Sequence, residues 1–159
     1  MKTKINVTLL ILFFVMSAFI AKSQVLVPFG STWKYLDDGT DQNTLWKDVA
    51  FDDAAWNSGT GEFGYAIGTV STTINFGVDP NNKFTTTYFR KNFTIADINS
   101  LEYIKLTIKR DDGAVIYVNG AEVLRSNMPA GTITYTTFSS SNNQATEVRL
   151  IPKSAFVQG

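Results

Sequence analysis

The sequence RDDGAVIYVNGAEVLR, residues 110–125, indicates the class of fold most clearly. Its middle part, residues 114–118, is a continuous apolar run rich in β-branched and aromatic side chains, which is typical of a strand buried on both faces. Asn119-Gly120 follows at once and is the strongest short signal for a two-residue hairpin turn. Residues 122–125 return as the second strand. The stretch therefore predicts a β-hairpin, entered through a turn at residues 111–113.

Short strands flank this hairpin on both sides. Residues 102–110, EYIKLTIKR, alternate with the period of two that indicates a strand with one solvated face. Residues 85–95 are rich in Thr and aromatic residues, and 132–138 and 146–151 are two further predicted strands joined by the polar loop 139–143. Many short strands and frequent turns, without a βαβ rhythm, predict an all-β chain folded as an antiparallel β-sandwich of the jelly-roll type.

Helical structure is expected to be minimal. Residues 96–99 and 152–156 could each form a single turn, and no longer window has helical periodicity. Residues 64–84 carry many Gly, Asn and Asp residues and are the least regular part of the sequence. We expect this segment to overhang one end of the sandwich.

The first 23 residues have the composition of a secretory signal peptide. A basic start precedes the apolar run 7–21, and Ala21-Lys22-Ser23 places small residues at positions −3 and −1 of a cleavage site. We therefore expect cleavage before Gln24, export to the cell envelope or the medium, and one domain over residues 24–159 without further membrane contact. The alternative is an uncleaved anchor, but the apolar run is shorter than the ~20 residues that span a bilayer.

The composition excludes several classes of chemistry. The chain has no Cys and no His, which excludes disulfides, thiolate or imidazole metal ligands, Cys nucleophiles and His-dependent catalytic triads. Three of the 14 basic residues lie in the leader, which leaves 11 basic against 14 acidic residues in the exported part. A mildly acidic domain with scattered bases is a poor nucleic-acid binder, so no nucleic-acid partner is expected.

Several short motifs follow one another in a fixed order along the exported part. They are TWKYLDDGT at 32–40, FDDAAW at 51–56, GEFGY at 61–65, TYFRKNF at 87–93, RDDGAVIYVNG at 110–120 and RSNMP at 125–129. In this order they resemble a galactose-binding-like jelly-roll module that is common in secreted multidomain proteins of bacteria. The resemblance covers residues 31–159.

The resemblance carries expectations about the protein context. Such modules often precede a purple acid phosphatase-like metallophosphoesterase domain, or stand beside adhesion and lamin-tail-like modules. The chain is similar, more distantly, to the N-terminal sugar-binding domain of family 2 glycosidases, which has an F-D-D-x-x-W segment and a V-Y-V-N-G hairpin. The resemblance implies an accessory domain rather than a catalytic one.

The sequence departs from the family's pattern at its C-terminal end. After a segment like residues 151–159, such modules continue with an Asn-initiated strand of the pattern N-x-I-A-V-E-V-H, whereas this sequence stops at Gly159. The resemblance therefore implies a domain that is C-terminally incomplete, lacks its last strand and belongs to a longer protein. It also implies an exposed sheet edge beside the gap.

Aromatic residues supply the first candidate ligand contacts. A flat ring stacks well on the C–H face of a pyranose, and Trp46 and Tyr65 are the candidates for this role. The alternative for any such ring is burial in the core, which we expect for Trp33 and Trp56.

Charged residues supply a second set of contacts. Arg110 with Asp111 and Asp112 could hydrogen-bond sugar hydroxyls at the end of a strand. The alternative, which we favour, is that the arginine pairs with a carboxylate inside the sandwich and fixes the strand register.

Acidic loops supply a candidate metal site. Ca²⁺ takes six to eight oxygen ligands from carboxylates and loop carbonyls, and Asp37 and Asp38 with Asp52 or Asp53 form the preferred set. Their spacing matches no EF-hand loop. The favoured alternative is turn chemistry, in which an Asp side chain accepts a hydrogen bond from its own backbone. A structural Ca²⁺ is the one cofactor that the sequence suggests.

Together these patterns predict a non-catalytic accessory module of a secreted protein. It would bind carbohydrate, as a polysaccharide or glycan, or position a downstream domain of the same polypeptide. The alternative is the N-terminal fragment of a secreted metallophosphoesterase or glycosidase whose catalytic domain is absent from this sequence. Catalysis by the chain itself is not expected, because no carboxylate lies in a recognisable catalytic context.

Overall fold

The computed structural model describes residues 24–65, 68 and 70–156, and within them the fold is all-β with three single-turn 3-10 helices. The predicted signal peptide lies outside the described residues. No helix in the described part is long and apolar enough to cross a membrane. The strands are β1 (Thr32–Leu36), β2 (Asn57–Thr60), β3 (Phe63–Gly64), β4 (Thr72–Thr73), β5 (Tyr88–Arg90), β6 (Tyr103–Asp111), β7 (Ala114–Val118), β8 (Ala121–Ser126) and β9 (Gln144–Pro152); the helices are η1 (Leu45–Lys47), η2 (Ile98–Ser100) and η3 (Lys153–Ala155).

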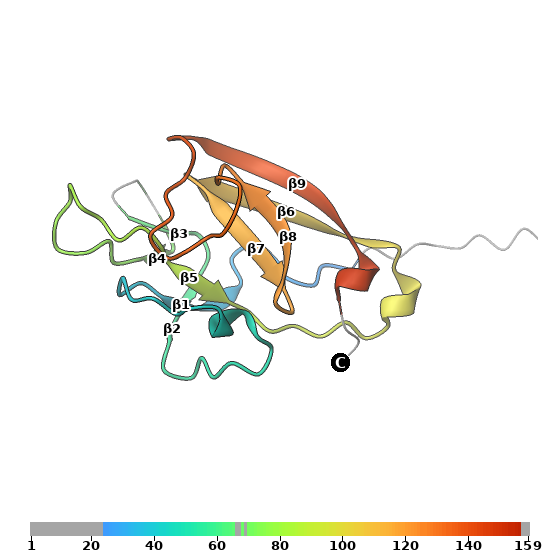
Figure 1. The fold of residues 1–159 in the computed structure, drawn as a ribbon. Helices are drawn as coiled ribbons and strands as arrows, with labels where there is room; N and C mark the ends of the chain where they lie inside the picture. Colours follow the sequence, from blue (N-terminus) through green and yellow to red (C-terminus); the bar gives the residue numbers. More distant parts are fainter. Residues whose placement is uncertain (1–23, 66–67, 69, 157–159) are drawn as a thin grey trace, which may run out of the picture.

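The strands form four small sheets (Figure 1). One is three-stranded with the antiparallel order β2-β1-β5, and β6–β9 and β7–β8 are antiparallel pairs. β3 and β4 pair in parallel. The all-β class is thereby confirmed, whereas the arrangement of the strands as a jelly-roll sandwich stays a prediction.

The hairpin that the sequence predicted is present as β7 and β8. Val118 pairs with Ala121, so Asn119 and Gly120 form a two-residue turn. Both turn residues have positive φ, 49° at Asn119 and 84° at Gly120, as a type I′ turn requires. The apolar run of β7 is half-buried along its whole length, which corrects the expectation of a strand buried on both faces.

The ribbon of β6 and β9 follows the predicted alternation. Ile104 pairs with Ile151 on the face turned toward the interior, and Ile151 is buried. Leu150 and Val148 of β9 lie on the opposite face with Tyr103 of β6, and all three side chains are exposed. This ribbon therefore has an apolar surface on each side.

The predicted strand over residues 132–138 is wrong. This segment forms a turn in which the backbone N–H of Thr137 donates to the carbonyl of Thr134 and the Thr137 hydroxyl accepts from the N–H of Thr134. Threonine hydroxyls that bond neighbouring backbone groups compete with strand pairing. This segment therefore forms a local turn despite its high β-propensity.

The predicted strand over residues 85–95 is much shorter in the structure. Only β5 pairs, with β1, and beyond Arg90 the ammonium of Lys91 donates to the carbonyl of Thr32 at 2.9 Å. The Lys91 side chain thus bonds the carbonyl at the start of β1, which strand pairing would otherwise use. Phe93, in the unpaired remainder of this segment, is exposed.

Aromatic rings make up much of the core beneath the β2-β1-β5 sheet. Trp56 is buried and contacts Phe51 and Tyr88 edge-on or tilted, with ring centroids 5.5 and 6.1 Å apart. Burial of each such ring removes ~150–250 Å² from water. Trp33, predicted to be core, is half-buried.

A buried arginine anchors the loop between β1 and β2 on this sheet. The Nε of Arg90 lies 2.9 Å from a carboxylate oxygen of Asp53, and its Nη1 donates to the carbonyls of Trp46 and Asp48. The same guanidinium lies over the ring of Phe51. These contacts join β5 to η1 and to the turn that leads into β2.

Candidate ligand-binding end of the molecule

Three segments that lie far apart in the sequence meet at one end of the molecule, on the left in Figure 1. The first follows β1, the second precedes β5, and the third is the turn at residues 134–137. The N–H of Gln42 donates to the Tyr88 hydroxyl at 3.4 Å, and the Thr86 hydroxyl donates to the carbonyl of Tyr135 at 2.8 Å. Loops that converge at one end of a rigid scaffold are where binding residues are most often found.

Side chains of Asp and Asn hold these loops in fixed turns. Asp38 accepts from the N–H of Thr40 at 2.9 Å and from its hydroxyl at 2.6 Å. Asn75 accepts from the N–H of Gly77, and Asp79 accepts from that of Asn81. Such local bonds fix turns at low entropic cost once the chain is folded. The loops are therefore preorganised.

A hollow of about 210 Å³ opens between these loops. Its lining combines two aromatic rings with hydroxyl, amide and ammonium groups: Gly39, Asn82, Lys83, Phe84, Thr85, Thr86, Tyr135 and Thr136. Phe84 is 37% exposed and Tyr135 is 38% exposed. Two half-open rings beside several hydrogen-bonding groups give the hollow both an apolar and a polar character.

Two glycines make room for the ring of Phe84. A methyl group built on Gly39 would lie 2.5 Å from Cδ1 of Phe84, and one built on Gly77 would lie 3.3 Å from its Cε1. Both glycines also have positive φ, 75° and 98°. The backbone at these two positions therefore packs directly on one edge of the ring.

Tyr65 and the two acidic residues of the β6–β7 turn lie near each other. Burial raises the pKa of the Tyr65 hydroxyl above its ordinary value, and the negative charges of Asp112 and Asp111 raise it further. The Tyr65 ring packs against Phe76 with centroids 5.0 Å apart and lies beneath the ammonium of Lys83. Tyr65 is thus half-buried, with its ring packed against Phe76 and Lys83.

Trp46, the other predicted stacking residue, lies apart from Tyr65. Its ring meets Tyr88 and Tyr117 edge-on, with centroids 5.0 and 5.7 Å apart. Lys47 lies over the same Tyr117 ring. Trp46 therefore links η1 to the β7–β8 hairpin, and the structure does not place it beside Arg110, Asp111 or Asp112.

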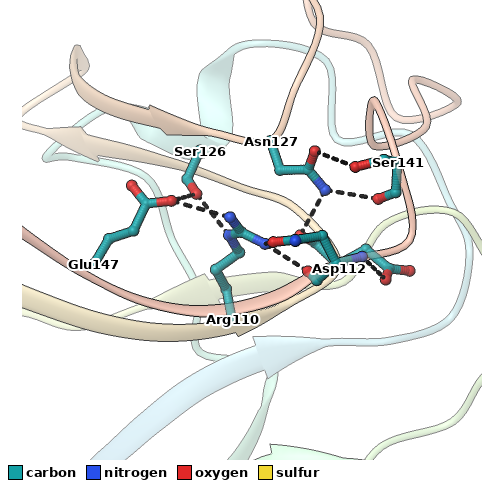
Figure 2. Close-up of polar contacts among 7 residues, drawn as sticks. Arg110, Asp112, Ser126, Asn127, Ser141 and Glu147 are labelled. Atoms are coloured by element: carbon teal, nitrogen blue, oxygen red, sulfur yellow. Dashed lines mark hydrogen bonds and ion pairs between the residues drawn. The ribbon is translucent and has the colours of Figure 1, made fainter.

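Arg110 is the centre of a polar network between β6, β8 and β9 (Figure 2). Its Nε donates to the hydroxyl of Ser126 at 2.6 Å, and its Nη2 lies 3.0 Å from Oε1 of Glu147. Its Nη1 donates to the carbonyl of Asp112 and to Oδ1 of Asn143. Because all three guanidinium nitrogens have partners within the chain, the geometry favours the structural role over sugar binding.

The same network ties down the loop that follows β8. Asn127 donates from Nδ2 to the carbonyls of Asp112 and Ser141 and accepts from the Ser141 hydroxyl (Figure 2). The carboxylate of Asp112 accepts from the N–H of Asn143. Sequence reasoning missed Ser126, Asn127 and Glu147 as members of this network. The only signal for Ser126 and Glu147 was a polar residue on an inward-facing strand position, and Asn127 lies just after β8.

Two carboxyl groups in this region have shifted pKa values. The hydrogen bond from Ser126, and then those from Arg110, hold the pKa of Glu147 below its ordinary value. The pKa of Asp111 is raised, first by desolvation and then by its hydrogen bond and charge repulsion with Asp112. The two pKa values thus shift in opposite directions: the pKa of Glu147, which bonds Arg110 inside the network, is lowered, and that of Asp111, at the β6–β7 turn, is raised.

Each carboxylate predicted to bind metal has a protein partner of its own. Asp37 is buried and accepts from the N–H of Asn75 at 2.6 Å, and Asp52 accepts from that of Ala54 at 2.9 Å. Asp38 bonds Thr40, and Asp53 bonds Arg90. Among the described residues, no three acidic side chains gather closely enough to hold a metal ion. The geometry favours the turn and ion-pair roles.

A second hollow, of about 290 Å³, lies on the β2-β1-β5 sheet beside Trp33. Its cations already have partners: Lys34 donates to the carbonyls of Ala54 and Trp56, and Arg90 pairs with Asp53. The hollow between the loops is the better candidate for a ligand site, because its rings, Phe84 and Tyr135, are exposed whereas Trp33 is half-buried.

No protein-family model matches this chain, and no match was found among the curated proteins or the solved structures. The resemblance to galactose-binding-like modules, which rests on the order of the sequence motifs, therefore stays a prediction.

Proposed function

We propose that residues 24–159 form a non-catalytic, galactose-binding-like jelly-roll module of an exported protein, and that this module binds carbohydrate. The observation that carries the proposal is the hollow between the loops, which joins half-exposed aromatic rings to hydroxyl and amide groups on a preorganised frame.

The chemistry of this hollow suits a sugar. A pyranose presents an apolar C–H face and a rim of hydroxyl groups. Aromatic residues supply a flat surface of large area, and threonine and asparagine side chains both donate and accept hydrogen bonds. A lining that joins two rings to hydroxyl and amide groups therefore matches both parts of the ligand.

The state of the carboxylates supports a non-catalytic role. Asp37, Asp53, Asp112 and Glu147 are the acidic side chains that are not fully exposed, and each accepts a hydrogen bond or ion pair from the protein. A glycosidase needs a pair of carboxyl groups that face a shared substrate pocket. The half-buried carboxylates here serve the fold instead.

A second role, the positioning of a neighbouring domain, is favoured by the outer face of β6 and β9. Tyr103, Val148 and Leu150 are exposed there on adjacent strands. Exposed apolar patches often mark interaction surfaces. This role suits the accessory module of a metallophosphoesterase or glycosidase and is compatible with sugar binding at the other site.

Affinity electrophoresis of the exported chain through polysaccharide gels tests the proposed function. We expect retardation in at least one polysaccharide gel, unchanged by EDTA if Ca²⁺ has no role and weakened by EDTA if a structural Ca²⁺ holds the loops. A mobility that no polysaccharide alters, with or without Ca²⁺, contradicts carbohydrate binding.

The proposed export has its own test. Expression of the full sequence in a host with a secretory pathway should release a chain whose N-terminal residue is Gln24. A chain that keeps residues 1–23 and stays in the membrane fraction would favour the anchor instead.

A further inference from the structure

We infer that the hollow between the loops holds one neutral pyranose, with Tyr135 and Phe84 as its contact rings, and that acidic sugars are disfavoured there; this inference rests on the proposed function. The inferred ligand site contains none of the ligand contacts that the sequence predicted, which were Trp46, Tyr65, Arg110, Asp111 and Asp112.

The two rings of the hollow are more exposed and less packed than Tyr65 and Trp46, the rings that the sequence predicted as sugar contacts. Tyr65 and Trp46 have ring partners on the protein, at centroid distances of 5.0 Å for both Tyr65–Phe76 and Trp46–Tyr88. Tyr135 and Phe84 are each more than a third exposed and line the hollow. A ring with an open surface can gain contact area from a ligand, whereas a ring already packed cannot.

Contacts with the rest of the protein fix the positions of Tyr135 and Phe84. The carbonyl of Tyr135 accepts from the Thr86 hydroxyl at 2.8 Å. The N–H of Phe84 donates to the carbonyl of Phe76 at 2.9 Å, and the ring edge rests on Gly39 and Gly77. A preorganised surface loses little entropy when the ligand binds.

Polar groups of the lining suit the hydroxyls of a single sugar unit. Asn82 and Thr136 are exposed at the edge of the hollow, and Thr85 and Thr86 lie half-buried beside Phe84. The volume of about 210 Å³ is smaller than the ~300–1,000 Å³ of pockets for drug-sized ligands, so one sugar unit is the expected occupant.

The charges around the hollow disfavour anions. None of the described residues that line the hollow carries a carboxylate, but Asp38 precedes Gly39, and Asp79 lies in the turn that leads to Asn82. The one lining cation, Lys83, lies over the rings of Tyr65 and Phe76. A ligand carboxylate would meet two nearby acidic residues and a cation directed elsewhere, whereas a neutral sugar meets no such repulsion.

Affinity electrophoresis with matched gels tests this inference on the exported chain. The probes are a neutral galactomannan, a neutral β-glucan and the polyuronate polygalacturonate. We expect retardation by a neutral polysaccharide, weaker retardation by polygalacturonate, and about tenfold lower affinity for Tyr135→Ala, in line with the loss of ~1.4 kcal/mol of ring contact.

Matched variants separate a binding role from a structural one. Tyr103→Ala removes a ring of the same type that is 53% exposed on β6, and should leave the affinity within about twofold. Tyr135→Phe should keep most of the affinity, and Asn82→Ala should lose part of it. Circular dichroism melts show which variants are folded, and Asn82→Ala provides the test if Tyr135→Ala fails to fold.

The outcomes distinguish the inference from the proposed function. Binding that is unaffected in both Tyr135→Ala and Asn82→Ala overturns this site and leaves carbohydrate binding intact. Tighter binding of polygalacturonate than of either neutral gel overturns the preference for neutral sugars. If no gel retards the unaltered chain, the proposed function and this inference fall together.

Discussion

The hydroxyl of Thr86 donates a 2.8 Å hydrogen bond to the carbonyl of Tyr135, a residue from a segment that is 49 positions further along the chain. This bond joins the segment just before β5 to the turn at residues 134–137, which carries the Tyr135 ring of the candidate site. The shape of the hollow therefore depends on a contact that neither segment can make alone.

Replacement of Thr86 by Val should loosen this junction. The variant keeps the β-branched shape and loses the donor, so we expect the free energy of unfolding to fall by about 1 kcal/mol, the usual net value of one hydrogen bond. Thermal unfolding followed by circular dichroism measures the change. Thr86→Ser, which keeps the hydroxyl, is the control and should lie closer to the unaltered chain; equal losses in both variants would mean that the bond has no role.

Removal of Arg110 should have the largest effect on stability among the polar residues. Its side chain is 7% exposed and holds β6, β8 and β9 together, so Arg110→Ala leaves buried polar groups without partners and should cost about 3 kcal/mol. Arg110→Lys should retain only part of this stabilisation, because an ammonium lacks the forked geometry of a guanidinium.

Chemical denaturation gives this free energy directly. The exposed Arg149 on β9 provides the control, and Arg149→Ala should change the stability by less than about 0.5 kcal/mol. Equal effects of the two alanine variants would contradict the structural role of Arg110.

The lowered pKa of Glu147 predicts a loss of stability in acid. A carboxyl group whose pKa is lower in the folded state stabilises the fold above its unfolded pKa, near 4.5, and this contribution is lost as the pH falls through the lower folded value. Glu147→Gln removes the titrating group, so its stability should depend less on pH below about 4.5. Urea midpoints measured from pH 7 to pH 3 test this, and two parallel pH profiles would argue against the prediction.

Substitution of Gly39 should disturb the Phe84 ring. A methyl group there would approach the ring to 2.5 Å at a backbone φ of 75°, so Gly39→Ala adds a steric clash to the conformational strain. Gly131→Ala is the matched control, because Gly131 has φ 87° and nothing lies within 4 Å of its added methyl group.

Both glycine variants should therefore lose about 1 kcal/mol from strain, and only Gly39→Ala should also lose sugar affinity. Affinity electrophoresis beside thermal melts separates the two effects. Unchanged affinity in a folded Gly39→Ala chain would show that the position of Phe84 does not matter for binding.

The parts of the fold that depend on local chemistry were predictable from the sequence. Asn119-Gly120 set the β7–β8 turn, because both positions need positive φ, and the alternation over residues 102–110 gave β6. Residues 132–138 have similar strand propensity, but a threonine hydroxyl bonds the neighbouring backbone and no described strand pairs with this segment.

The candidate site was largely hidden from the sequence. Arg110 and Asp112 were predicted as ligand contacts, and nothing in the pattern showed that Ser126 and Glu147 would bind the guanidinium. Phe84 and Tyr135 lie in irregular segments without periodicity, so only the folded arrangement of the loops places their rings around one hollow.

Carbohydrate binding between the loops at this end of the molecule can be mapped residue by residue. The measurement is a titration of ¹⁵N-labelled protein with a neutral oligosaccharide, followed by amide chemical shifts. We expect the largest shifts at residues 39–42, 82–86 and 134–136, with little change on the outer face of β6 and β9. Shifts confined to that outer face or to the surroundings of Trp33, or no shifts at saturating sugar, would contradict it.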